Sequence, residues 1–586
     1  MVSSTARSNP GRARVTMLGL GFTLAWVFIG VQLVNVQLVM AEDLGEGSRA
    51  QRTETRTVKA SRGSIFDRGG SPLAITVESQ SVFADPALVE DPIETAQQVS
   101  LVLGIATNPV FEKLSKDSRF VWIARQVEPA MAEQIRALEL PGIYLESEPR
   151  RVYPAGSKTA QVLGIVDIDG NGQEGIEYVY NDALQGIPGT VMYERANKNN
   201  VSIPQAGRLI EPAVPGVDLY TTIDLAVQYT AIDVCDRTVA ETGAKGCWIV
   251  ALNAETGEIL AMAGTPRFDP VTRRVLNPTT EEDPGFGNFA VRGAYEPGST
   301  MKLISFAAAL DSGSVSAETV IYNVADVFES YKGACETAEE GEEQIYGCFH
   351  DVNKHAPQDM TVSEIFAQSS NVGTIRVLQN LDFETMIGYF TGFGFDSETG
   401  VDFNGEATGA FGIEPGCSSC RHSAAIGYSV AVTPLQMAAA YGVVANDGVW
   451  TRPFLVSHTV DVDGKVSVSE PVERRVISEE TARTMRRLLA MVVTEGTGSA
   501  AQVPGYRVGG KTGTAYKSEN GVYTDETMAS FVGMAPIDDP KVVVAVVVDS
   551  PDKEYHAGGK AAAPAFAEVM EAALNALGVV PDAFIG

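Results

Sequence analysis

The sequence predicts a membrane-anchored α/β (α+β) protein with at least two domains, the larger of which contains an antiparallel sheet flanked by helices. Three observations support this fold class. The chain has 586 residues, which is more than one hydrophobic core usually supports. A long uncharged segment lies near the N-terminus. Apolar runs of strand length recur between residues 216 and 586, and a helix-forming segment follows the last of them.

The uncharged segment spans residues 15–41 and is long and apolar enough to cross a bilayer as a helix. Arginines precede it and acidic residues follow it, which places residues 1–14 in the cytoplasm and the bulk of the chain outside. A cleaved signal peptide is the alternative, because Val39-Met40-Ala41 resembles a cleavage site. The apolar core is long for a signal peptide, so we expect a retained anchor over residues 15–40.

A change of pattern near residue 216 predicts a boundary between a domain at 41–215 and a domain at 216–586. The second domain begins with an expected strand at 216–224 and an amphipathic helix at 225–242. Further strands are expected at 247–252, 258–262, 528–534 and 542–548, and a last helix at 564–577. The formal charge of −30 argues against nucleic acid as a partner.

The stretch from Tyr295 to Lys302 predicts a nucleophilic serine. Pro297 and Gly298 indicate a turn into a helix that continues with almost wholly apolar residues. Residues three apart share a helix face, so the amine of Lys302 is expected to reach the hydroxyl of Ser299. An apolar setting lowers the pKa of a lysine, and the neutral amine can then act as a general base.

Two further elements follow in the chain: Ser369-Ser-Asn371 and Lys511-Thr-Gly-Thr514. Ser-x-x-Lys, Ser-x-Asn and Lys-Thr-Gly in this order resemble the trio of penicillin-binding proteins and serine β-lactamases. Two decoys are set aside. The second Ser-x-x-Lys, Ser550 to Lys553, follows a strand and contains a proline, so no helix holds its lysine. Ser518-Glu-Asn520 comes after the Lys-Thr-Gly element instead of before it.

The segment Arg62 to Ala74 resembles the Arg-Gly-x-Ile-x-Asp-Arg-Asn-Gly-x-x-Leu-Ala signature of class B penicillin-binding proteins, with Gly69 in place of the usual asparagine. The segments at 150–156, 162–164 and 174–177 are similar to other motifs of this family. The resemblance implies a penicillin-binding transpeptidase fold with an all-helical subdomain, preceded by an elongated, β-rich pedestal (dimerisation) domain. Nothing between Val39 and Asp218 resembles the glycosyltransferase module of class A relatives.

The resemblance also implies a peptidoglycan D,D-transpeptidase that forms an acyl-enzyme on Ser299 and needs neither cofactor nor metal. Lys302 takes the serine proton, Ser369 relays a proton and Asn371 binds the donor peptide. Lys511 adds positive charge. The other residues of the third element are expected to bind substrate, and these are Thr512, Gly513 and Thr514.

The implied partners are peptidoglycan stem peptides, β-lactams, a membrane-embedded glycosyltransferase and other division proteins, at the bacterial cytoplasmic membrane. Val82 to Pro86 and a compact pedestal favour the division-specific (FtsI-type) subfamily over the elongation type. A β-lactam sensor or an inactive division scaffold is the alternative outside enzymes. A sensor needs a larger signalling part than residues 1–14, and a scaffold would tolerate loss of Lys302 or Lys511.

Six cysteines lie on the expected extracytoplasmic side, where disulfides persist. Proximity in the chain favours three pairs, Cys235–Cys247, Cys335–Cys348 and Cys417–Cys420. Zinc is an alternative, since some elongation-type relatives carry a zinc site in this domain and His350, His355 and His422 lie near the last four cysteines. Their spacing fits no standard zinc motif, and free or mixed thiols also remain open.

Overall fold

The computed structural model of the protein describes residues 10–39, 53–194, 208–276, 287–337, 347–413, 416–519 and 522–582. Contacts divide the chain into two compact units: residues 1–60 with 187–214, and residues 61–186 with 215–586. The first unit contains helix α1 (Pro10–Val34) and a small antiparallel sheet of β1 (Thr53–Val58), β6 (Gly189–Glu194) and β7 (Arg208–Glu211). Residues Arg14–Gln37 have a mean hydropathy of 2.0, which is apolar enough for one membrane span.

The centre of the second unit is a five-stranded antiparallel sheet in the order β10-β9-β25-β24-β23. Its strands are β9 (Gly246–Asn253), β10 (Ile259–Thr265), β23 (Gly509–Glu519), β24 (Val522–Ala535) and β25 (Val542–Asp549). Successive residues of β25 alternate between two hydrophobic cores, because neighbouring side chains of a strand point to opposite faces. Both faces of the sheet are therefore covered, and the expected antiparallel sheet is confirmed.

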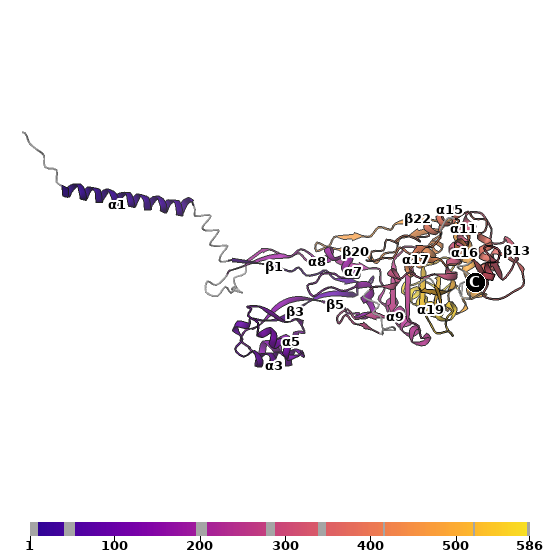
Figure 1. Cartoon of the computed structure of the whole chain (residues 1–586), viewed down its shortest axis with the longest axis horizontal. Coiled ribbons are helices and arrows are strands. Elements are labelled where there is room, and N and C mark those ends of the chain that lie inside the picture. The colour runs from indigo at the N-terminus through magenta and orange to yellow at the C-terminus, as the bar shows by residue number, and fades with distance from the viewer. Residues whose placement is uncertain are drawn as a thin grey trace, which may run out of the picture. The chain divides into compact units, whose positions relative to one another are not determined.

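Helices α9 (Leu225–Thr242) and α19 (Gly558–Ala576) share one of these cores (Figure 1). The expected bounds of α9 are confirmed. The last helix begins six residues before the expected start at Pro564, so that proline lies inside it. A side chain at Gly558 would place its Cβ 2.2 Å from Ser530 O and 2.3 Å from Gly513 O. The glycine therefore lets the helix start directly against the sheet.

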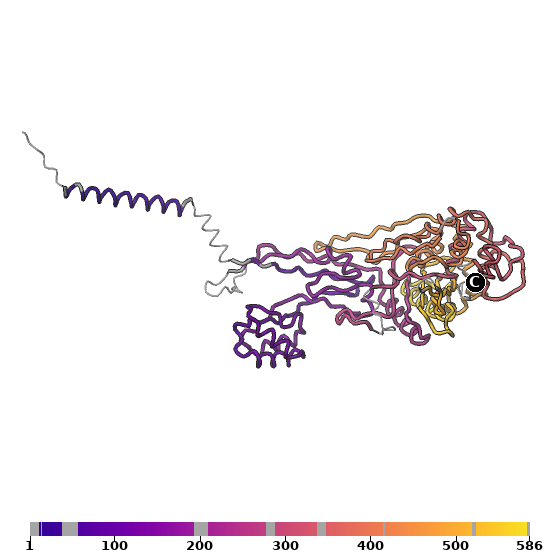
Figure 2. The backbone as a smooth tube through the Cα atoms, viewed as in Figure 1, coloured from indigo at the N-terminus to yellow at the C-terminus, as the bar shows by residue number. Residues whose placement is uncertain are grey.

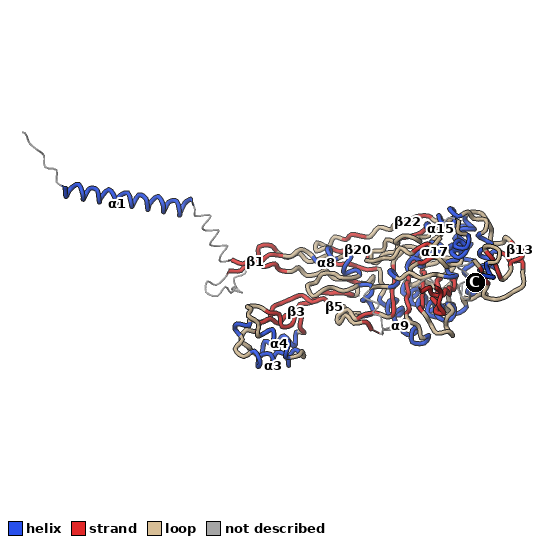
Figure 3. The backbone as a smooth tube through the Cα atoms, viewed as in Figure 1, coloured by secondary structure: helices blue, strands red, loops and turns tan. Residues whose placement is uncertain are grey.

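The other face of the sheet is covered by mainly helical segments (Figure 3). They include α11 (Lys302–Asp311), α13 (Val362–Gln368), α14 (Asn371–Leu378), α15 (Phe383–Gly392), α16 (Ser418–Ala425), α17 (Pro434–Ala445) and α18 (Glu479–Thr494). Every side chain from Lys302 to Ala309 is buried, as the apolar pattern of this helix predicts. The acidic stretch at 338–346 lies outside the described residues.

The pedestal part of the second unit is built on the long strand β3 (Pro72–Ala84), which pairs with β4 (Val121–Val127) and β5 (Ile143–Val152). Helices α3 (Pro92–Leu103), α4 (Thr107–Leu114) and α5 (Pro129–Ala137) pack on one face of these strands. Strand β2 (Ile65–Phe66) pairs with β8 (Asp218–Thr221), which pairs with β20 (Val456–Val460). Segments far apart in sequence therefore run side by side (Figure 2).

Two arginines of the pedestal motifs meet at one buried carboxylate, Glu177. Arg62 Nε lies 2.7 Å from Glu177 Oε2, and Arg151 Nε lies 2.7 Å from Glu177 Oε1. Tyr153 donates to the same Oε1 at 3.4 Å. Two guanidinium groups thus surround a carboxylate that is 0% exposed. Three motifs that are separate in the sequence form one ion cluster.

Candidate active site

Ser299 lies in a 3₁₀ turn, Gly298–Met301, that leads directly into α11. Gly298 has a φ of 55°, and a Cβ there would lie 2.8 Å from Thr514 O, so the turn requires glycine. The buried Tyr441 hydroxyl donates to Thr300 O at 3.0 Å and fixes the turn from behind. Residues three apart eclipse each other in such a turn, which places Ser299 and Lys302 on one side.

Lys302 is fully buried, and its amine faces the second motif. Nζ donates to Ser369 O at 2.6 Å and to Asn371 Oδ1 at 2.7 Å, and it lies 3.3 Å from Ser369 Oγ. The sequence leads us to expect a contact with the Ser299 hydroxyl, yet Ser299 Oγ has no hydrogen bond within the described residues. The hydrogen-bond partners of the amine come instead from the loop at 369–371.

Ser369 caps the C-terminus of α13, and Asn371 begins α14. Ser369 has a φ of 59°, a left-handed conformation that a non-glycine residue adopts at a cost. This reversal turns both its carbonyl and its hydroxyl toward Lys302. Asn371 Nδ2 donates to His350 O at 2.8 Å, which leaves Asn371 Oδ1 as the acceptor for the lysine.

Lys511 lies on the edge strand β23 and is also fully buried. Its Nζ donates to Ser369 Oγ at 2.9 Å and to Thr512 O at 3.3 Å. A side chain at Gly513 would put a Cβ 2.7 Å from Pro297 O, so the glycine allows β23 to lie against the serine turn. The structure therefore brings the three motifs into one cluster around Ser369 Oγ.

The two lysines are expected to lose their protons easily. Burial, and then the nearby charge of Lys511, hold the pKa of Lys302 well below its ordinary value, while the Asp351 carboxylate acts in the opposite direction. Burial lowers the pKa of Lys511 to about 7. Neutral amines next to a partly exposed serine can accept a proton near neutral pH.

The two threonines of the third motif have hydrogen-bond partners within the chain. Thr512 Oγ1 lies 2.7 Å from Thr497 Oγ1. Thr514 Oγ1 accepts a hydrogen bond from Gly558 N, at the start of α19, at 3.1 Å. A role for these hydroxyls in substrate binding stays a prediction.

Comparison with known proteins identifies the family. Residues 247–571 match the penicillin binding protein transpeptidase domain, and residues 57–221 match the penicillin-binding protein dimerisation domain. The chain belongs to the class B penicillin-binding proteins. All three sequence motifs lie within the first matched span.

Similar penicillin-binding proteins match over nearly the whole chain. Stage V sporulation protein D of Bacillus subtilis is 34% identical and covers 97% of this chain and 86% of that protein. Peptidoglycan D,D-transpeptidase FtsI of Buchnera aphidicola is 28% identical, over 97% of this chain and 95% of that protein. Penicillin-binding protein 3 of Mycobacterium tuberculosis, complexed with aztreonam, is 27% identical with a TM-score of 0.67, over 90% of this chain and 98% of that chain.

The decoy serine of this penicillin-binding protein lies in a different environment. Ser550 Oγ lies 2.9 Å from Glu526 Oε2 and 2.6 Å from Asp549 Oδ1, and Lys517 Nζ donates to it at 3.2 Å. Lys553 is 87% exposed and pairs with Asp525. No described contact brings this lysine to Ser550. Asn520 of the other decoy lies outside the described residues.

The cysteines form the three pairs that sequence proximity favours: Cys235–Cys247, Cys335–Cys348 and Cys417–Cys420. In the described ranges, Cys335, Cys348 and His350 lie close enough together to hold a metal ion. Zinc binds thiolates, whereas two of these sulfurs are joined in a disulfide. The donor set therefore does not fit zinc in this oxidised state.

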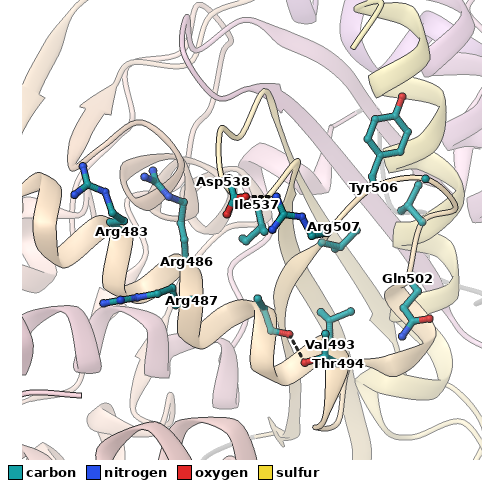
Figure 4. Close-up of a pocket in the computed structure, with 14 residues that line it drawn as sticks. Arg483, Arg486, Arg487, Val493, Thr494, Gln502, Tyr506, Arg507, Ile537 and Asp538 are labelled. Carbon is teal, nitrogen blue, oxygen red and sulfur yellow. Dashed lines mark hydrogen bonds and ion pairs between the residues drawn. The ribbon is translucent and has the colours of Figure 1, made fainter. Parts of the chain in front are cut away.

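A cavity of about 670 Å³ lies apart from the motif residues, between α18 and the segment before β23 (Figure 4). Four arginines line it: Arg483, Arg486, Arg487 and Arg507. Three of them pair with carboxylates, namely Glu479, Asp447 and Asp538. Local charge is nearly balanced, and no motif residue reaches the cavity, so it is not part of the candidate active site.

The residues behind the second motif were not predicted from the sequence. His350 and Asp351 contact Ser370, Asn371 and Val372, although only His350 drew attention, as a zinc ligand. Thr497, the partner of Thr512, belongs to no recognisable motif. These residues come from outside the three motifs, and only the fold brings them together.

Proposed function

We propose that this penicillin-binding protein is a peptidoglycan D,D-transpeptidase that cross-links stem peptides through an acyl-enzyme on Ser299. The observation that carries the proposal is the convergence of Lys302, Lys511 and Asn371 around Ser369 beside the serine turn. A nucleophile, a base of lowered pKa and a polar relay are the parts that acyl transfer requires. The family supplies the substrate class, the D-Ala-D-Ala end of a stem peptide.

In the first half-reaction, Ser299 Oγ attacks the carbonyl carbon of the penultimate D-alanine, and Lys302 takes the hydroxyl proton. The carbon–nitrogen bond then breaks, and the departing D-alanine amine receives a proton through Ser369. Lys511 and the hydroxyls of Thr512 and Thr514 hold the terminal carboxylate. Backbone N–H groups of Ser299 and Thr514 stabilise the oxyanion.

In the second half-reaction, an amine of a neighbouring stem peptide attacks the Ser299 ester. The amine loses a proton to the same polar cluster, the ester bond breaks, and Ser299 regains its hydrogen. A new peptide bond joins the two stems. β-Lactams acylate the same serine, because their strained amide takes the place of the donor peptide.

The direct test is covalent labelling with a fluorescent penicillin. Wild-type protein should be labelled at Ser299, and Ser299→Ala should not. Lys302→Ala should slow labelling by about 10²- to 10⁴-fold, the usual worth of general-base assistance. Ser550→Ala is the matched control, because it removes the serine of the decoy motif, and it should label at the wild-type rate. Undiminished labelling of Ser299→Ala would refute the site assignment.

We further propose that the apolar helix anchors the protein in the bacterial cytoplasmic membrane, with the catalytic domain outside. A membrane-embedded glycosyltransferase and other division proteins are the proposed partners. The Val82–Pro86 segment and the match to a relative named FtsI support a septal role. Depletion should then give filaments or chained cells. Rounded cells that still divide would favour the elongation type.

A further inference from the structure

Two neighbouring residues hold the second catalytic motif from behind. His350 ends β15 (Cys348–His350), and Asp351 follows it directly. His350 O accepts the amide of Asn371 at 2.8 Å. Asp351 Oδ2 accepts the Ser370 hydroxyl at 2.7 Å, and Asp351 Oδ1 accepts Val372 N at 3.0 Å. Three consecutive residues after Ser369 are therefore bound to one short segment.

The Asp351 carboxylate is well placed to hold residues 370–372. Its side chain is only 6% exposed, and its own N–H donates to Asp326 O at 2.9 Å. It lies at the first turn of α14, where unpaired backbone N–H groups and the helix dipole favour a negative charge. Ser370, whose hydroxyl donates to Asp351, also accepts Gly373 N at 2.8 Å and so caps the helix. The carboxylate thus fixes the start of the helix that carries Asn371.

This arrangement determines what Lys302 meets. With the Asn371 amide committed to His350 O, Asn371 Oδ1 is the atom that faces Lys302 Nζ, at 2.7 Å. The cationic groups on the other side are Lys302 and Lys511, which share the Ser369 hydroxyl. Asp351 is the carboxylate whose charge acts on Lys302.

We propose that Asp351 is a positioning residue for acyl transfer, which holds Ser370 and the first turn of α14 so that Asn371 faces Lys302. It also supplies a negative charge behind the two lysines. The inference rests on the proposed function, since it concerns the rate at which Ser299 is acylated. Asp351 does not contact the proposed nucleophile Ser299, and it lies behind the second motif and not in the proposed substrate site. Its effect passes through Ser370, Asn371 and the charge that Lys302 feels.

The charge predicts a shift in pH dependence with a definite sign. Asp351 raises the pKa of Lys302, opposing burial and Lys511, so removing the charge lets that pKa fall further. The rise in acylation rate that accompanies loss of the lysine proton should then move to lower pH. His355 also faces Asp351, with Nε2 at 3.1 Å, and its pKa is raised by hydrogen bonds to Ala356 O and to Asp351. Asp326 adds to that rise, so the histidine must be tested separately.

The experiment measures the rate of fluorescent-penicillin acylation against pH for the full-length protein. Asp351→Asn should lower the rate by about 10- to 100-fold, the usual effect of a small misplacement, and should move the acid limb to lower pH. Asp351→Glu keeps the charge, so the limb should stay near the wild-type pH while the rate falls. Asp359→Asn is the matched control: it removes an exposed carboxylate that accepts Asn323 N at 2.9 Å, and it should change neither quantity.

Two further variants keep the test decisive if Asp351→Asn does not fold. Ser370→Ala removes the hydroxyl that Asp351 holds but keeps the charge, so the rate should fall without movement of the limb. His355→Gln should retain an acid limb, and loss of that limb would assign it to the histidine and contradict the proposal. A wild-type rate and limb in Asp351→Asn, or a wild-type rate in Ser370→Ala, would overturn the inference. Failure of the wild-type protein to label would instead count against the proposed function.

Discussion

Lys302 and Lys511 meet at a single hydroxyl: their Nζ atoms lie 3.3 and 2.9 Å from Ser369 Oγ. Both side chains are fully buried, and each ammonium disfavours a second positive charge nearby. The pair therefore loses its first proton at a pH far below that of an exposed lysine. One neutral and one charged amine then flank Ser369. The neutral amine can act as a base, and the charged amine can bind a carboxylate.

This relationship predicts a pH profile for acylation. The rate should rise with pH as the lysine pair loses its first proton, because the base must be neutral to accept the Ser299 proton. Burial lowers the pKa of Lys511 to about 7 and places that of Lys302 well below its ordinary value, so the rise should lie at or below neutral pH. The limb belongs to the pair, since coupled groups titrate together.

Lys511→Ala provides the matching measurement. Without the second charge, the pKa of Lys302 should rise, so the acid limb should move to higher pH while the rate falls. Stopped-flow or time-resolved labelling across a pH series reads both effects. A limb that moves to lower pH in Lys511→Ala would contradict the coupling.

The buried ion cluster of the pedestal predicts a stability effect. Glu177→Ala should cost about 3–5 kcal/mol, because it leaves the guanidinium groups of Arg62 and Arg151 buried without their carboxylate. Urea unfolding of the purified protein measures the change. Glu133→Gln breaks an exposed pair with Arg136 and should change stability by less than about 0.5 kcal/mol. Equal effects of the two variants would show that the buried cluster stabilises the fold no more than an exposed ion pair does.

The three motifs could be recognised in the sequence because acyl-transfer chemistry requires particular residue types at short spacings. Ser299 and Lys302 are three residues apart, and local helical geometry alone places them on one side of the turn. The partners of Lys302 were not predictable in the same way. They depend on the left-handed turn at Ser369, which the residue type does not predict. They also depend on Asp351, which lies about twenty positions before the motif that it binds.

The sheet shows the same division between local and distant information. Apolar runs predicted four of its five strands, and both cores bury β25 along its whole length. The edge strand β23, which carries Lys511, was not predicted. The strand at 218–221 was predicted as well, yet its pairing with β2 and β20 depends on segments more than 150 residues away. The start of α19 at Gly558 was not predicted. Glycine at this position allows close contact with the sheet, and it is not a residue type that indicates the start of a helix.

The cysteine pairs and the anchor predict the covalent state of the mature protein. All six cysteines should be protected from alkylation before reduction and react after it, since the structure pairs each one. Intact mass spectrometry of the native protein should also find the apolar segment present. Six reactive thiols without reduction would contradict the pairing, and an N-terminus at Glu42 would contradict the retained anchor.

The fate of the acylated serine separates a transpeptidase from a β-lactamase with the same three motifs. A β-lactamase must activate water, which class A enzymes do with a dedicated glutamate. Glu296 and Asp351 are carboxylates beside the motif residues. Both oxygens of Asp351 accept hydrogen bonds, whereas Glu296 uses only Oε1 among the described residues. Glu296 Oε1 accepts Ser429 N at 2.7 Å and Tyr523 OH at 3.2 Å, and burial raises its pKa.

We therefore expect the Ser299 ester to persist until an amine arrives. After excess penicillin is removed, the label should remain on wild-type protein for much longer than acylation takes. Bulk penicillin should be consumed in a single stoichiometric burst, because the three motifs contain no carboxylate that could draw a proton from water. A donor ester with an added acceptor amine should give the amide product in preference to the acid. Rapid hydrolysis of penicillin over many turnovers, lost in Ser299→Ala, would replace the transpeptidase assignment with a hydrolase.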